Sequence, residues 1–133
     1  MKKWVVFVCC LALFACNRTV HYDPSLIVAP EKIIERVMTS QPPEYADTVP
    51  SKVSVKNDSI EMWTSESGGG GKPEVSAGAI YYKNIGKIML NHTDIWYVSI
   101  LDQSGVLMYN VFSFKENEAK QFIDALYTLT GKQ

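Results

Sequence analysis

Between residues 52 and 112, hydrophobic and polar residues alternate in short runs, which is the pattern of half-buried β-strands. The runs predict strands at 52–56, 60–63, 79–82, 85–90, 95–101 and 106–112. Polar turns at 83–84, 91–94 and 102–105 separate the last of these. Because turns this short join only antiparallel neighbours, the pattern predicts an antiparallel meander.

Two other segments have the spacing of amphipathic helices. The first begins at Pro30, which suits a first helical position, and stops before the Pro42-Pro43 pair. The second follows Ser113, which together with Glu116 matches a capping box, and Gly131 stands where a helix terminator belongs. Its apolar residues fall at i, i+3, i+4 and i+7, namely Ala119, Phe122, Ile123 and Leu126. We therefore expect an α+β fold, in which the C-terminal helix covers the strands and a short helix precedes them.

The N-terminal residues have the composition of a secretory signal peptide. Lys2 and Lys3 precede an uninterrupted run of apolar and small residues at 4–15, which ends at Cys16. A membrane-spanning helix needs about 20 apolar residues, so this run is short for a span. It is typical of the hydrophobic region of an export signal.

Leu13-Phe14-Ala15-Cys16 resembles the lipobox of bacterial lipoproteins, with Leu three residues before the cysteine and a small residue next to it. Phe14 departs from the small residue usual at its position. The resemblance implies that Cys16 carries diacylglycerol and palmitate, and that the mature protein is anchored in the bacterial cell envelope. The membrane could be the inner or the outer one, on a periplasmic or surface face. The alternatives are an ordinary signal peptide cleaved elsewhere and an uncleaved anchor.

This interpretation divides the chain into a signal peptide at 1–15, a lipidated tether at 16–29 and a single α+β domain at 30–133. The tether is expected because 17–29 is polar and contains Pro24. Once the signal is removed, 11 basic and 14 acidic residues remain, a net charge of −3. Nucleic-acid binding needs a surplus of Lys and Arg, so we expect no nucleic-acid partner.

The order of strands and a closing helix is similar to the pleckstrin-homology-like (PH-like) fold, an open β-barrel plugged by a C-terminal helix. The resemblance is carried by 80–85, 96–98, Ser104-Gly105 and 118–126. It departs from the family in showing six predicted strands where the fold has seven, and Phe122 where the closing helix often has Trp. A plain α+β layer, with both helices on one face of the sheet, is the alternative. Phosphoinositide binding is not expected, because only Lys52 and Lys56 lie near the first hairpin.

Catalytic and metal-binding patterns are not found in the mature sequence. His21 and His92 are its only histidines, and zinc needs three or four convergent ligands. The glycines at 68–71 are followed by Lys72 and Pro73, which does not fit a phosphate-binding loop. We therefore expect neither an enzyme nor a cofactor.

Aromatic residues on the predicted strands are the remaining candidates for a binding site, and they are Trp63, Tyr81, Trp96, Tyr97 and Tyr109. Adjacent aromatic residues on a strand point to opposite faces, so one member of each pair can remain outside the core. Exposed Tyr and Trp anchor interfaces, although the same residues also fill cores. The expected function is a non-catalytic module that binds another envelope protein through a strand edge or an aromatic face. The alternative is a carrier of a small apolar or carbohydrate ligand.

Overall fold

The protein, seen here in a computed structural model, is described over residues 18–65 and 74–133. It has the expected α+β class, with two antiparallel sheets and a helix at the C-terminus. The predicted signal peptide, Cys16 and the tetraglycine segment lie outside the described residues.

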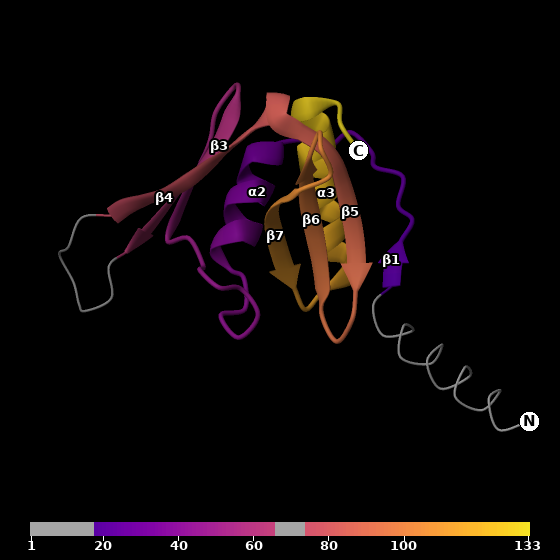
Figure 1. Cartoon of the computed structure of the whole chain (residues 1–133), viewed down its shortest axis with the longest axis horizontal. Coiled ribbons are helices and arrows are strands. Elements are labelled where there is room, and N and C mark those ends of the chain that lie inside the picture. The colour runs from indigo at the N-terminus through magenta and orange to yellow at the C-terminus, as the bar shows by residue number, and fades with distance from the viewer. Residues whose placement is uncertain (1–17, 66–73) are drawn as a thin grey trace, which may run out of the picture.

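Each sheet has its own set of strands (Figure 1). The larger sheet has the order β1-β5-β6-β7, with bounds Arg18–Val20, Ile85–His92, Trp96–Asp102 and Leu107–Ser113. The smaller sheet has the order β2-β3-β4, with bounds Lys52–Val55, Ser59–Ser65 and Glu74–Tyr81. Every neighbouring pair is antiparallel, as predicted.

The predicted single meander is interrupted between β4 and β5. A short 3-10 helix, η1 (Tyr82–Asn84), occupies the expected turn. The Tyr82 backbone N–H donates to the Asp58 carbonyl at 3.0 Å, and its hydroxyl donates to the Lys56 carbonyl at 2.8 Å. These bonds fix Tyr82 to the β2–β3 turn, so β5 begins a new sheet. The two sheets of the described residues do not close into a barrel.

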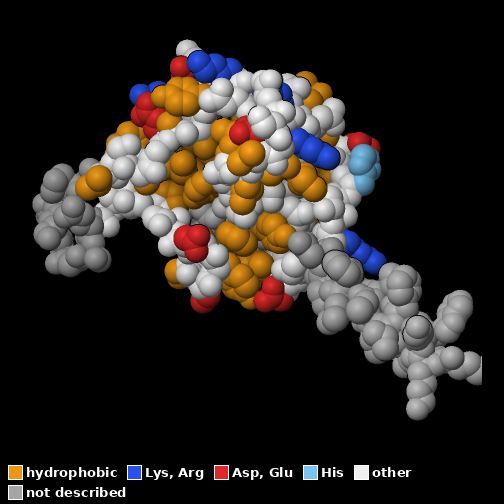
Figure 2. Space-filling view, viewed as in Figure 1, with side chains coloured by type: hydrophobic (Ala, Val, Ile, Leu, Met, Phe, Trp, Pro, Cys, Tyr) orange, Lys and Arg blue, Asp and Glu red, His pale blue; other side chains and the backbone are white. Residues whose placement is uncertain are grey.

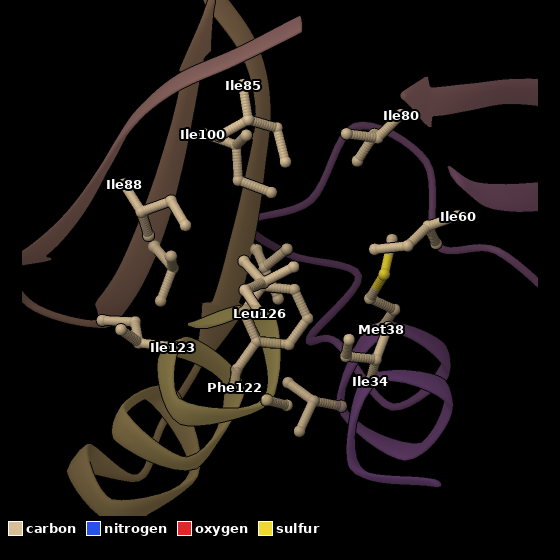
Figure 3. Close-up of a cluster of buried hydrophobic side chains, with 14 of the residues drawn as sticks. Ile34, Met38, Ile60, Ile80, Ile85, Ile88, Ile100, Phe122, Ile123 and Leu126 are labelled. Atoms are coloured by element: carbon tan, nitrogen blue, oxygen red, sulfur yellow. The ribbon is translucent and has the colours of Figure 1, made fainter. Parts of the chain in front are cut away.

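Helices α2 (Pro30–Thr39) and α3 (Glu116–Thr130) pack against each other. Helix α2 also packs on β2, whereas α3 lies against β5, β6 and β7. Both helices and both sheets direct apolar side chains into one core (Figure 3). The side chains labelled there are Ile34, Met38, Ile60, Ile80, Ile85, Ile88, Ile100, Phe122, Ile123 and Leu126.

The two ends of α3 differ in how well the sequence predicts them. Gly131 has the expected left-handed conformation, with φ of 70°, and donates its N–H to the Tyr127 carbonyl at 2.8 Å. The prediction of a capping box at Ser113 was wrong. Ser113 ends β7, and the N-cap residue is Lys115, whose side chain makes no capping hydrogen bond. The Ser113 hydroxyl instead accepts the Lys115 backbone N–H at 3.1 Å, two residues along the chain.

Residues 18–28, the N-terminal strap, differ from the expected free tether because they are bound along the domain. Strand β1 pairs with β5, and Val20, Tyr22 and Ile27 pack against the core. The Ile27 N–H donates to the Thr128 hydroxyl at 3.0 Å. Within the described residues, neither helix is long and apolar enough to cross a bilayer.

Candidate binding groove

A groove of about 530 Å³ lies between the two sheets. Strands β3 and β4 form one wall, β7 forms the other, and the loop at 45–50 contributes to the lining. The lining includes the side chains of Tyr45, Asp47, Met62, Ile80, Tyr109 and Phe112. Figure 2 shows hydrophobic side chains gathered on this face, in the middle of the view. The volume falls in the range of ordinary ligand sites, about 300 to 1,000 Å³.

The wall formed by β4 is lined by small residues. Ala77, Gly78 and Ala79 follow one another there, opposite a register shift between Met62 and Trp63. Gly78 has φ of 136°, a conformation that side chains rarely adopt, so glycine suits this irregularity. The short side chains leave room for an occupant beside β7.

Strand β7, which forms the second wall, is an edge strand of the larger sheet. Gln41 lies against it. Gln41 follows α2 and is only 3% exposed. Its Nε2 donates to the Met38 carbonyl at 2.9 Å and to the Tyr109 hydroxyl at 3.3 Å. Its Oε1 accepts the backbone N–H of Phe112 at 3.1 Å. Gln41 therefore links the end of α2 to the outer edge of β7.

Aromatic rings cluster at the end of the groove near the loop at 45–50. The centroid of Phe112 lies 6.3 Å from that of Tyr45 and 5.5 Å from that of Tyr97. Phe114, which is 62% exposed, meets Tyr45 edge to face at 5.9 Å. The cluster provides a large apolar surface that is open to water.

Hydrogen bonding and burial shift the titration of groups around this end. The Tyr45 hydroxyl donates to Asp94 Oδ2 at 2.8 Å, which lowers the pKa of Asp94 and raises the pKa of Tyr45. Burial raises the pKa of Tyr109. Both hydroxyls are therefore protonated at neutral pH.

A row of polar side chains crosses the larger sheet and ends at the groove. The Thr19 hydroxyl donates to Asn91 Oδ1 at 3.0 Å, and Asn91 Nδ2 donates to the Ser99 hydroxyl at 3.0 Å. Ser99 in turn donates to Asn110 Oδ1 at 2.7 Å. Asn110 lines the groove, and its hydrogen bond from Ser99 holds its side chain in place.

The structure brings only part of the predicted aromatic set to this site. Tyr109 lines the groove, and Tyr97 lies beside Phe112. Trp63 lies under the Lys52 ammonium at 5.1 Å, Tyr81 is 44% exposed on β4, and Trp96 stacks on His92 at 4.1 Å. None of these three lines the groove.

Sequence reasoning missed three residues of the site, Gln41, Tyr45 and Phe112. Tyr45 lies in a loop and Gln41 follows a helix, so strand periodicity gives no signal for either. Phe112 was within a predicted strand and must face opposite to Val111, but both residues are apolar, so the sequence does not show which one faces outward.

Within the described residues, no cluster of three or more His, Cys, Asp or Glu side chains is suited to hold a metal ion. His21 instead lies 3.1 Å from Asp23 on the exposed strap. Comparison of the chain with protein-family models, with curated proteins and with solved structures finds no significant match. The chemistry of the groove is therefore the basis for a functional proposal.

Proposed function

We propose that the protein is a non-catalytic binding module of the bacterial cell envelope, anchored by lipid on Cys16, which binds a segment of another envelope protein. The observation that carries the proposal is the groove between the sheets, which runs beside an edge strand. Its walls are mostly apolar, and Asp47 alone is formally charged among the described residues that line it. A neutral, largely apolar segment is the partner chemistry that such walls favour.

Two finer parts of the proposal concern the anchor and the fold. The lipobox-like run at 13–16 supports lipidation. We also propose that the domain is a divergent PH-like domain. Antiparallel strands followed by a C-terminal helix support that assignment, as does the complete burial of Phe122 on this helix.

Photocrosslinking in intact cells tests the protein-binding function. A benzophenone amino acid at Leu107, which lines the groove and is 51% exposed, is expected to capture a specific envelope protein. The same amino acid at Val28, which is 92% exposed on the strap, is the matched control and should not capture that protein. Equal products from both positions, or none from Leu107, would contradict the proposal.

The second candidate is a small apolar or carbohydrate ligand, and the aromatic cluster of Tyr45, Tyr97 and Phe112 favours it. Tilted rings at an open surface offer stacking faces to sugars and acyl chains. Aromatic proton NMR of Tyr45, Tyr97 and Phe112 would follow titration with dispersed envelope lipids and with glycan fragments. Saturable shifts confined to these rings would favour the small ligand, and unshifted resonances would remove its support.

A further inference from the structure

We infer that the partner of the groove binds as an added β-strand on the free edge of β7. The inference rests on the proposed protein-binding function and specifies its geometry. Among the residues that the structure describes, β7 pairs with β6 on one side and has no strand on the other. Edge strands present unpaired backbone groups, and an extended peptide can complete them.

The direction of the backbone groups follows from one observed bond. The Phe112 N–H donates to the side chain of Gln41, which is not part of the sheet, so the backbone of Phe112 points away from β6. In an antiparallel pair, alternate residues direct their N–H and C=O groups to the same side. The β6–β7 register has no shift between Phe112 and Asn110. The backbone N–H and C=O of Asn110 therefore point toward the groove.

Gln41 also shows what kind of group this edge accepts. Its side chain is a primary amide, the chemical equivalent of a peptide group, and it is bound to the edge at Phe112. An added strand would continue from this amide toward Leu107, along the part of β7 that lines the groove. Gln41 then marks one end of the added strand.

The walls define the sequence of the added segment. Successive side chains of a strand alternate between two faces. One face of the segment would meet Met62, Ile80 and Tyr109, which calls for apolar residues at alternate positions. Asp47 on the lining disfavours Asp and Glu in the segment. The small residues at 77–79 leave space for these side chains.

Two substitutions of Asn110 separate its backbone from its side chain. Asn110→Pro removes the outward N–H, whereas Asn110→Ala keeps it and removes only the amide bonded to Ser99. With the crosslinker at Leu107, we expect Asn110→Pro to reduce the yield at least about tenfold and Asn110→Ala less than about threefold. Equal yields from the two variants would overturn strand addition.

A second measurement does not depend on the folding of a variant. The captured segment, identified by mass spectrometry, is synthesised and titrated against the wild-type domain with single N-methyl groups along its backbone. Strand addition predicts that methylation at alternate positions abolishes binding and that the intervening positions tolerate it. Binding that is insensitive to every methyl group would overturn the inference and leave the protein-binding function standing.

The identity of the captured chain separates the two proposals. No captured chain at all overturns the proposed function itself. Capture of a second copy of this protein would overturn the commitment to a different envelope protein. Capture of a different protein through a neutral, alternating segment supports both.

Discussion

The Asp124 carboxylate is buried on the face of α3, and groups of the N-terminal strap donate hydrogen bonds to it. The side chain is 8% exposed. The Tyr22 hydroxyl lies 2.9 Å from each carboxylate oxygen, and the Ser25 backbone N–H donates to Oδ1 at 2.9 Å. A buried carboxylate without such donors is costly, so these bonds hold the strap to the helix.

Replacing Tyr22 with Phe tests this role. The variant keeps the ring and removes the hydroxyl, so the free energy of unfolding should fall by about 1.5 to 3 kcal/mol, the usual range for a bond to a charged group. Urea unfolding at pH 7 measures it. The matched control is Tyr81→Phe, on a side chain that is 44% exposed, and it should cost little. Equal losses in the two variants would contradict the assignment.

The same hydroxyl makes stability depend on alkaline pH. Burial, followed by the interaction with Asp124, raises the pKa of Tyr22 to about 12. Burial also raises the pKa of Tyr82 to about 12. In the unfolded chain both titrate near about 10, so the folded state holds more protons between these values and stability falls as pH rises there.

Urea midpoints from pH 9 to 12 check this dependence. Stability should be constant below pH of about 10 and decline above it. Because Tyr22→Phe removes one of the four tyrosines whose pKa is raised, its decline should be shallower than that of the wild type. Parallel declines would show that Tyr22 does not contribute.

Sequence periodicity predicts the position of a residue only where that position depends on its neighbours in the chain. Tyr109 lay on a predicted strand, and the structure places it in the lining of the groove. Gln41 was beyond such reasoning, because its partners are the carbonyl of Met38, the hydroxyl of Tyr109 and the N–H of Phe112. Two of these lie on a strand that is about 70 positions away in the chain.

At the scale of elements, Gly131 tests how the C-terminus of α3 is capped. A Cβ at this position would meet no atom within 4 Å, so only the φ of 70° opposes a side chain. Gly131→Ala should therefore lower the free energy of unfolding by about 1 kcal/mol. Gly131→Asn should cost less than this, because Asn tolerates the left-handed region. Urea unfolding of both variants decides, and an alanine variant as stable as the wild type would contradict the cap.

The strands were predictable and their division into two sheets was not. Alternation is a local property, so the predicted strands overlap β2 to β7. The division depends on Tyr82, whose bonds to Lys56 and Asp58 close across the β2–β3 turn. A second constraint is Gly86, where an added Cβ would lie 2.4 Å from the Asp102 carbonyl oxygen. Neither of these long-range contacts can be predicted from the alternation of hydrophobic and polar residues.

At the scale of the whole molecule, the strap changes how an anchored domain would stand at the membrane. Its polar composition predicted a flexible spacer, yet its residues pair with β5 and bind α3. A strand as short as β1 has too few residues to show a period. The bound position of the strap is therefore seen only from its partners on β5 and α3, which lie far along the chain.

Labelling with palmitate tests the anchor on which this geometry depends. Cells grown with labelled palmitate should mark the wild-type protein and leave Cys16→Ala unlabelled, because the thiol is the proposed acylation site. Equal labelling of both proteins would contradict lipidation.

The bound strap also predicts which end of the domain faces the bilayer. Cys16 can lie no farther than about 7 Å from Arg18, given the reach of about 3.6 Å per residue. Arg18 pairs with His92, and His92 stacks on Trp96 at 4.1 Å. Trp63 instead lies on β3, in the sheet on the opposite side of the molecule from β1 (Figure 1). Trp96 should therefore be close to the lipid headgroups, and Trp63 farther from them.

Fluorescence of the lipidated protein in vesicles measures this orientation. From Cys16 onward the chain contains only Trp63 and Trp96, so Trp63→Phe and Trp96→Phe each leave one reporter. A quencher attached to lipid headgroups should reduce emission in Trp63→Phe much more than in Trp96→Phe. A flexible tether would let the domain tumble and quench both reporters alike, and that result would contradict the bound strap.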